Sequence, residues 1–221
     1  PITEAEDEEP YVYVETLEQL TRLVQLNVLE FHVWGSVVAD IHRADTLVFD
    51  LDPDEGLPFS RVAEAAHEVR ARLAELGLPS FCKTTGGKGL HVVAPIQPTL
   101  GWDDIKQFTK AVSEEFARRH PERYTSKITK VSRRGRVFID YLRNQFDATA
   151  IGAYSARARP GATVSVPVRW DEVTGSLDPS TYTVRSVPHR LAHLAADPWA
   201  DLDASRTAVT DAMKDAVGFG D

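Results

Sequence analysis

At residues 47–52 the chain reads Leu-Val-Phe-Asp-Leu-Asp. Side chains alternate between the two faces of a β-strand, so this pattern predicts a strand over residues 46–52 with its apolar side chains facing a core. Asp50 and Asp52 then point together toward the opposite face. Two neighbouring carboxylates repel each other unless a cation lies between them or one takes a proton. The pair therefore favours a site for a hard divalent cation, Mg²⁺ or Mn²⁺, over a pair of solvent-facing acids on an amphipathic edge strand.

A second predicted strand, at residues 137–142, also carries an acid. Asp140 is out of phase with the apolar side chains on either side of it, as the first two aspartates are. If all three carboxylates converge, they can hold two metal ions for an in-line displacement at phosphorus. The sequence leaves a second interpretation open, in which Asp140 is a strand-end acid that pairs with Arg136 or Arg143.

A glycine-rich loop separates two further apolar runs, and residues 84–91 read Thr-Thr-Gly-Gly-Lys-Gly-Leu-His. Glycines let backbone amides approach phosphate oxygens, while Lys88 adds a positive charge and Thr85 a hydroxyl. His91 begins the next strand, from which it can reach the same phosphates. The loop does not have the Gly-x-x-x-x-Gly-Lys-Ser/Thr pattern of a P-loop, and taken alone it is equally typical of a hairpin turn.

The predicted elements mix helices and strands without a regular βαβ rhythm. We therefore expect an α+β fold with a mixed or antiparallel central sheet flanked by helices, rather than a doubly wound fold. Helices are expected at residues 16–27, 58–77, 103–119 and after Pro188; strands are expected at 29–34, 46–52, 81–84, 90–96, 137–142, 150–154 and 163–168. Residues 1–10 are predicted to be an acidic disordered lead-in, 11–203 the catalytic domain and 204–221 a C-terminal helix or tail.

Charge is distributed unevenly along the chain. The formal net charge is −8, yet residues 118–143 carry nine basic and two acidic side chains, a local +7 that leaves −15 elsewhere. A basic segment on an acidic body is compatible with binding an anionic polymer on one face, or with a solvated helix end and loop. The candidate DNA-binding residues are Lys127, Lys130, Arg133, Arg134 and Arg136.

Composition narrows the class of protein. A single cysteine, Cys82, excludes an intrachain disulfide and a zinc site built from several thiolates. No apolar run approaches the roughly 20 residues of a membrane-spanning helix, and no signal peptide begins the chain. We expect a soluble, cytosolic protein without a membrane partner.

Three motifs occur in a characteristic order: Asp50-Leu51-Asp52, then the loop that ends at His91, then Asp140. Their order and approximate spacing resemble those of the archaeo-eukaryotic primase superfamily, most closely the polymerase domain of bacterial ligase D. Two flanking runs are also similar to that family, Leu-Glu-Phe-His-Val-Trp-Gly-Ser at residues 29–36 and Ala-Tyr-Ser-Ala-Arg-Ala-Arg-Pro at residues 153–160. The resemblance extends from about residue 11 to residue 203.

The resemblance implies a nucleotidyltransferase that adds nucleotides to a DNA 3′ end by two-metal catalysis with Mn²⁺ or Mg²⁺. Its substrates would be nucleoside triphosphates, ribo or deoxyribo, and broken DNA ends, in non-homologous end joining with Ku and a DNA ligase. The implied metal ligands are Asp50, Asp52 and Asp140. The implied contacts to the incoming nucleotide are His32, Thr85, Lys88, His91, Ser155 and Arg157, and Arg133 would help there or on the primer-template.

The chain departs from the family pattern in two ways. Thr85 stands where the family commonly has serine, and the hydroxyl is retained. Polymerase domains of the family also have a further N-terminal segment of several dozen residues, implicated in gripping the 5′-phosphate of a gapped end. This chain is expected to begin after that segment.

The sequence leaves two alternative functions open. Residues 48–52 also resemble the first motif of haloacid-dehalogenase-type phosphatases, in which the first aspartate is a nucleophile and the second an acid/base. That family has Thr or Val where Asp54 stands, and its fold is doubly wound. The other alternative is a truncated, non-catalytic module that binds nucleotide or DNA.

Overall fold

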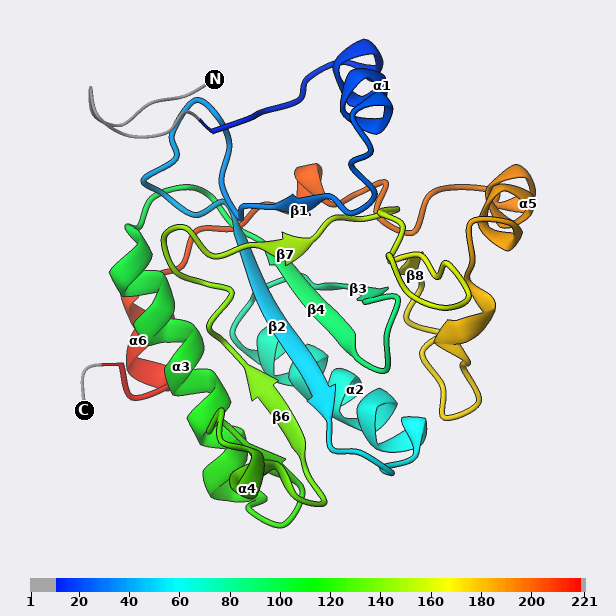
Figure 1. Ribbon diagram of the computed structural model, residues 1–221. Helices are drawn as coiled ribbons and strands as arrows, with labels where there is room; N and C mark the ends of the chain where they lie inside the picture. Colours follow the sequence, from blue (N-terminus) through cyan, green and yellow to red (C-terminus); the bar gives the residue numbers. More distant parts are fainter. Residues whose placement is uncertain (1–10, 220–221) are drawn as a thin grey trace.

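The computed structural model describes residues 11–219 and contains a six-stranded central sheet (Figure 1). The strand order is β5-β6-β2-β4-β3-β8, and every neighbouring pair is antiparallel except the parallel pair β5 and β6. The bounds are β2 Thr46–Pro53, β3 Phe81–Thr84, β4 Leu90–Pro95, β5 Tyr124–Thr125, β6 Val137–Asp140 and β8 Pro167–Val168. This mixed, mainly antiparallel sheet with its helices confirms the expected α+β class.

Two long helices cover one face of the sheet. Helices α2 (Phe59–Glu75) and α3 (Trp102–Arg119) both contact β2, and their apolar side chains recur at helical spacing. The fully buried side chains of this layer include Leu47, Phe49, Leu51, Val62, Val69, Leu73, Ile105, Phe108 and Val112. The predicted core-facing side of β2 is therefore confirmed, and its acidic side is left on the face without these helices.

A separate two-stranded sheet pairs β1 (His32–Val33) with β7 (Ala150–Ile151), and it lies across the upper part of the view in Figure 1. Both strands are shorter than the expected 29–34 and 150–154. β7 ends at Ile151, and Tyr154 has a φ of 61°, a left-handed conformation that a strand extending to residue 154 would not contain. The amide of Phe31 donates to the Ser155 hydroxyl (2.8 Å) instead of to a strand partner.

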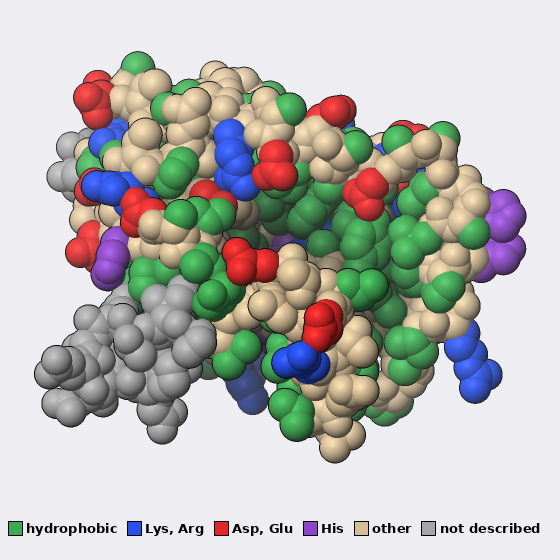
Figure 2. Space-filling model, turned by 90° about the horizontal axis from the view of Figure 1, so that it is seen from above, with side chains coloured by type: hydrophobic (Ala, Val, Ile, Leu, Met, Phe, Trp, Pro, Cys, Tyr) green, Lys and Arg blue, Asp and Glu red, His purple; other side chains and the backbone are tan. Residues whose placement is uncertain are grey.

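Helix α1 (Leu17–Gln25) begins at the predicted capping box, formed by Thr16 and Gln19. None of its residues is buried, and Leu17 is 78% exposed. Figure 2 shows hydrophobic side chains gathered on this upper face of the molecule.

No helix among residues 11–219 has the length and apolar character needed to cross a membrane.

The C-terminal part contains α5 (Ser186–His193), α6 (Asp211–Ala216) and two 3-10 turns, Pro179–Thr181 and Asp203–Ser205. Val209 and Val217 are buried in the same core as α2 and α3. The segment after residue 203 is therefore packed into the core rather than only onto the surface. The expected disordered lead-in, residues 1–10, lies outside the described residues.

Cys82 is fully buried in β3. Burial raises the pKa of its thiol to about 12, because the thiolate would lose its hydration. The cysteine therefore acts as a small apolar core residue.

We predict that Phe49→Ala lowers the free energy of unfolding by about 3–5 kcal/mol, because it leaves a cavity between β2 and the helices. Urea denaturation measures the change. Leu17→Ala, at an exposed position, is the control and should change stability by less than about 1 kcal/mol. Equal effects of the two substitutions would contradict the assignment of this core.

Candidate active site

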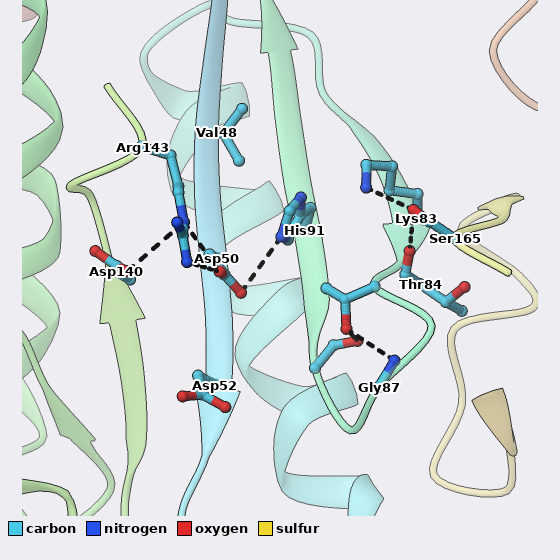
Figure 3. Close-up of polar contacts among 12 residues, drawn as sticks. Val48, Asp50, Asp52, Lys83, Thr84, Gly87, His91, Asp140, Arg143 and Ser165 are labelled. Atoms are coloured by element: carbon cyan, nitrogen blue, oxygen red, sulfur yellow. Dashed lines mark hydrogen bonds and ion pairs between the residues drawn. The ribbon is translucent and has the colours of Figure 1, made fainter. Parts of the chain in front are cut away.

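The polar face of the sheet carries a row of ionisable side chains. Lys83 pairs with His91 across β3 and β4, His91 pairs with Asp50 across β4 and β2, and Asp50 pairs with Asp140 across β2 and β6. Directly paired residues of antiparallel strands point to the same face, so all four side chains lie on one side of the sheet. Asp52, two residues after Asp50, joins them on that face. The strand register thus brings the three predicted aspartates onto adjacent positions (Figure 3).

Asp50 lies at the centre of the row and is only 15% exposed. Its Oδ1 is 3.4 Å from His91 Nε2, and its Oδ2 accepts from Arg143 Nε and Nη2, both at 3.3 Å. Burial acts to raise the pKa of Asp50, but the facing His91, Arg143 and Lys83 outweigh burial and hold the pKa at about 2. Asp50 is therefore ionised at neutral pH.

At the other two aspartates, the net shift of the pKa is in the opposite direction. The pKa of Asp52 and of Asp140 is raised, chiefly by burial and further by the negative charge of Asp50. Arg133 Nη1 lies 2.6 Å from Asp52 Oδ2, and Arg143 Nε lies 3.9 Å from Asp140 Oδ2. Figure 3 shows Arg143 between Asp50 and Asp140. Among residues 11–219, no three His, Cys, Asp or Glu side chains are grouped closely enough to hold a metal ion as they stand.

Asn144 fixes the loop that carries Arg143. This side chain is 1% exposed, donates to Val48 O and accepts from Val48 N, both at 2.7 Å. The amide thus continues the pairing of β2 beyond the end of β6, as a strand residue would. Arg143 is held beside Asp50 as a result.

The glycine-rich loop between β3 and β4 is stabilised by its own threonine. Thr85 Oγ1 accepts from Gly87 N and donates to Gly89 O, both at 3.2 Å. A Cβ at Gly89 would lie 2.5 Å from Leu51 O, so only glycine allows the loop to pass this close to β2. Arg157 Nη1 donates to Thr85 O (2.8 Å) from the segment that follows β7.

These groups surround a cavity of about 230 Å³. Of the predicted site residues it is lined by His32, Asp50, Asp52, Thr85, Lys88, His91 and Arg157. Arg143 and Arg159 also line it, although no sequence motif pointed to this role for them. The cavity lining therefore combines two carboxylates with cationic side chains and a glycine-rich loop, and one of the cations, Arg143, contacts Asp50.

Two of the predicted site residues, Asp140 and Ser155, do not line this cavity. Asp140 does not line the cavity and lies one strand further out. Ser155 is 4% exposed, and its hydroxyl accepts from Phe31 N (2.8 Å) and donates to Ala156 O (3.1 Å). Its hydroxyl holds the entry to β1, and the structure does not bring it to the cavity.

His91 and Lys83 are the most deeply buried side chains of the row, at 2% and 3% exposure. Burial lowers the pKa of His91, and its Nδ1 has no hydrogen-bond partner among the described residues. Lys83 Nζ donates to Ser165 Oγ (2.7 Å), and burial lowers the pKa of the amine to about 7. Lys83 was missed at the sequence level; the available signal was its place one residue before the Thr-Thr-Gly-Gly-Lys-Gly loop.

The basic segment is attached to the acidic end of β2. Arg133 contacts Asp52, and its guanidinium also lies 4.0 Å from the centre of the Phe138 ring. Gly135 N donates to Asp54 Oδ2 (2.7 Å). Helix α4 (Lys130–Arg133) forms the middle of the segment, and Lys127 and Arg136 line a second cavity of about 250 Å³ beside it. Of the five candidate DNA-binding residues, only Arg133 reaches the aspartates.

Comparison with known proteins agrees with this geometry. Residues 1–199 match the LigD primase-polymerase domain. The multifunctional non-homologous end joining protein LigD of Pseudomonas aeruginosa is 42% identical over 212 residues, which cover 96% of this chain and 25% of that protein. The chain belongs to the LigD primase-polymerase domain family. This confirms the family expected from the three motifs.

Two further LigD proteins are similar to this chain, one in sequence and one also in structure. The LigD protein of Mycolicibacterium smegmatis is 36% identical over 165 residues, covering 74% of this chain and 22% of that protein. The solved polymerase domain of Mycobacterium tuberculosis ligase D, in complex with DNA, has a TM-score of 0.80 at 33% identity, covering 87% of this chain and 69% of that one. The chain spans about a quarter of the length of the curated LigD proteins it matches.

We predict that the buried Lys83 makes the stability of this LigD domain rise with pH. The folded-state pKa of about 7 lies below the ordinary value near 10.4, so between these values the unfolded chain binds a proton that the folded chain does not. The free energy of unfolding should then rise from pH 7 to pH 9, and the difference between the parent chain and Lys83→Met should change by up to about 1.4 kcal/mol per pH unit. Urea denaturation at several pH values tests this. Lys88→Met, which removes an exposed lysine, is the control; parallel curves for the parent and Lys83→Met would contradict the prediction.

Proposed function

We propose that this chain transfers nucleotidyl groups from nucleoside triphosphates to the 3′ end of a DNA strand. The observation that carries the proposal is the lining of the 230 Å³ cavity, which brings together two aspartates, several cationic side chains and a glycine-rich loop. Carboxylates suit hard divalent cations, and cations with accessible backbone amides suit phosphates. Membership in the LigD primase-polymerase family supports the same activity.

Asp50, Asp52 and Asp140 would hold the divalent cations, Mn²⁺ or Mg²⁺. The fit is supported by three hard oxygen donors on adjacent strands and by the repulsion from Asp50 that helps to raise the pKa of the other two. Held by these residues, such ions would supply charge stabilisation for the attacking 3′-hydroxyl and for the leaving pyrophosphate. Arg133 and Arg143 supply the positive charge near these carboxylates in the structure.

The residues of the chain have separate roles in this proposal. His32, Lys88 and Arg157 would bind the triphosphate, because they line the cavity and carry or can carry positive charge. His91 would orient Asp50 through its Nε2, since it is itself almost fully buried. Thr85 and Ser155 would act through their internal hydrogen bonds, which shape the loop and the entry to β1.

The relatives suggest the biological setting. The curated relatives are named as non-homologous end joining proteins, and the mycobacterial polymerase domain was solved with DNA. We therefore propose that this domain acts on primer-template, gapped or overhanging DNA ends in the bacterial cytosol, with Ku and a DNA ligase as partners. The basic segment would contact the DNA backbone.

The alternative functions are not favoured. A haloacid-dehalogenase-type phosphatase requires a doubly wound parallel sheet, whereas all but one of the strand pairs of the central sheet are antiparallel. A non-catalytic binding module is distinguished by measurement. It would bind a nucleoside triphosphate without lengthening a primer.

We predict that Asp50→Asn and Asp52→Asn each reduce Mn²⁺-dependent primer extension at least about 100-fold, because removing a ligand to a catalytic metal forfeits several kcal/mol of charge stabilisation. Asn keeps the shape of the side chain, and thermal melting checks that each variant folds. Asp103→Asn, at an exposed acid in the first turn of α3, is the control and should keep full activity. Undiminished extension by the Asp50 and Asp52 variants would refute the metal-site assignment.

We also predict that the triple variant Lys127→Ala, Lys130→Ala, Arg134→Ala weakens DNA binding and flattens its salt dependence. For every phosphate that the variant no longer neutralises, the slope of log K against log salt should fall by about 0.9. Fluorescence anisotropy at several salt concentrations measures this slope. Arg185→Ala, at an exposed cation near α5 and far from α4, is the control (Figure 1). An unchanged slope in the triple variant would remove the segment from the DNA interface.

A further inference from the structure

Glu30 lies two residues before the start of β1 and contacts two of the cavity-lining side chains at once. Its Oε2 is 2.9 Å from His32 Nε2 and 3.1 Å from Arg157 Nε, while its Oε1 accepts from Ala158 N at 2.8 Å. His32 and Arg157 line the cavity, and Glu30 does not. One carboxylate therefore contacts both side chains from behind.

Arg157 is also the link between this carboxylate and the glycine-rich loop. Its Nη1 donates to Thr85 O (2.8 Å), so the guanidinium connects the segment before β1 to the loop between β3 and β4. Nη1 makes this hydrogen bond, whereas the buried Nε contacts Glu30 as an ion pair at 3.1 Å without forming a hydrogen bond. A free arginine side chain has about 2 kcal/mol of rotamer entropy to lose when it is fixed, and these contacts fix it before any ligand binds.

Glu30 is suited to this role because it remains ionised. Its hydrogen bond to His32 is the largest influence and, with the amide of Ala158 and the charge of Arg157, lowers the pKa of Glu30 to about 2 against the opposing effect of burial. The carboxylate is 24% exposed, and Arg157 is 14% exposed. An ion pair in such a partly buried position keeps its geometry better than one at a fully exposed position.

We infer that Glu30 is a positioning residue, which orients His32 and Arg157 toward the phosphates of the incoming nucleotide without touching the nucleotide itself. The inference rests on the proposed function, because it assumes that the cavity accepts a nucleoside triphosphate. It adds a residue that lies outside the acidic row, the glycine-rich loop and the basic segment.

Positioning and simple electrostatics predict opposite results at this residue. Glu30 places a negative charge near the phosphates, so its removal would tighten triphosphate binding if charge alone decided the affinity. If Glu30 fixes the two cations, its removal leaves them mobile and weakens binding. The sign of the change therefore separates the two mechanisms.

The test is Glu30→Gln, which removes the charge and keeps an oxygen that accepts from Ala158 N. We expect the affinity for ATP with Mg²⁺ to fall about tenfold by isothermal titration, as is typical when a binding residue is deprived of its supporting partner. The affinity for AMP should change by less than twofold, because AMP lacks the outer phosphates. Unchanged or tighter ATP binding, or an equal loss for AMP, would overturn the inference.

Controls separate this result from folding and from catalysis. Glu18→Gln removes an equally charged side chain that is 72% exposed and pairs with Arg22, and it should leave ATP binding unchanged. Thermal melting of Glu30→Gln should match the parent within a few degrees. Primer extension by the parent chain tests the proposed function separately, because the binding comparison requires no turnover.

Discussion

A strand that buries apolar side chains on one face and carries ionised groups on the other cannot shift its pairing by one residue. A slip of one residue would place Asp50 and Asp52 in the core and expose Leu47, Phe49 and Leu51. The free energy of that exchange is prohibitive, because charges would lose hydration and apolar surface would gain it. The register of β2 therefore decides which residues of β4 and β6 face the aspartates.

Electrostatic balance is the second consequence of this register. Three carboxylates on one face are contacted by side chains from three separate places: the cations Arg143 after β6 and Arg133 on α4, and the imidazole of His91 on β4. Arg133 also belongs to the basic segment, and Gly135 attaches the same segment to Asp54. The proposed DNA-contacting surface and the proposed metal site are therefore coupled through Arg133.

Features that are set by a local sequence pattern could be predicted from the sequence. The alternation in β2, the glycine-rich loop and the spacing to Asp140 depend on neighbouring residues, and they led to the correct fold class and family. The lengths of β1 and β7 were overestimated, because β7 ends at Ile151 and the Phe31 amide donates to the Ser155 hydroxyl instead of to a strand partner. The positions of Ser155, Glu30 and Lys83 depend on contacts between residues more than 80 apart in sequence, and no local pattern encodes such contacts.

The single cysteine has a practical consequence for spectroscopy. A thiol with no exposed surface and a pKa of about 12 forms almost no thiolate near neutral pH, so alkylating reagents react with it very slowly. A cysteine introduced on the surface would be the one thiol in the chain that such reagents modify readily. Fluorophores or spin labels could thus be attached at chosen positions, with Cys82 left in place to fill the core.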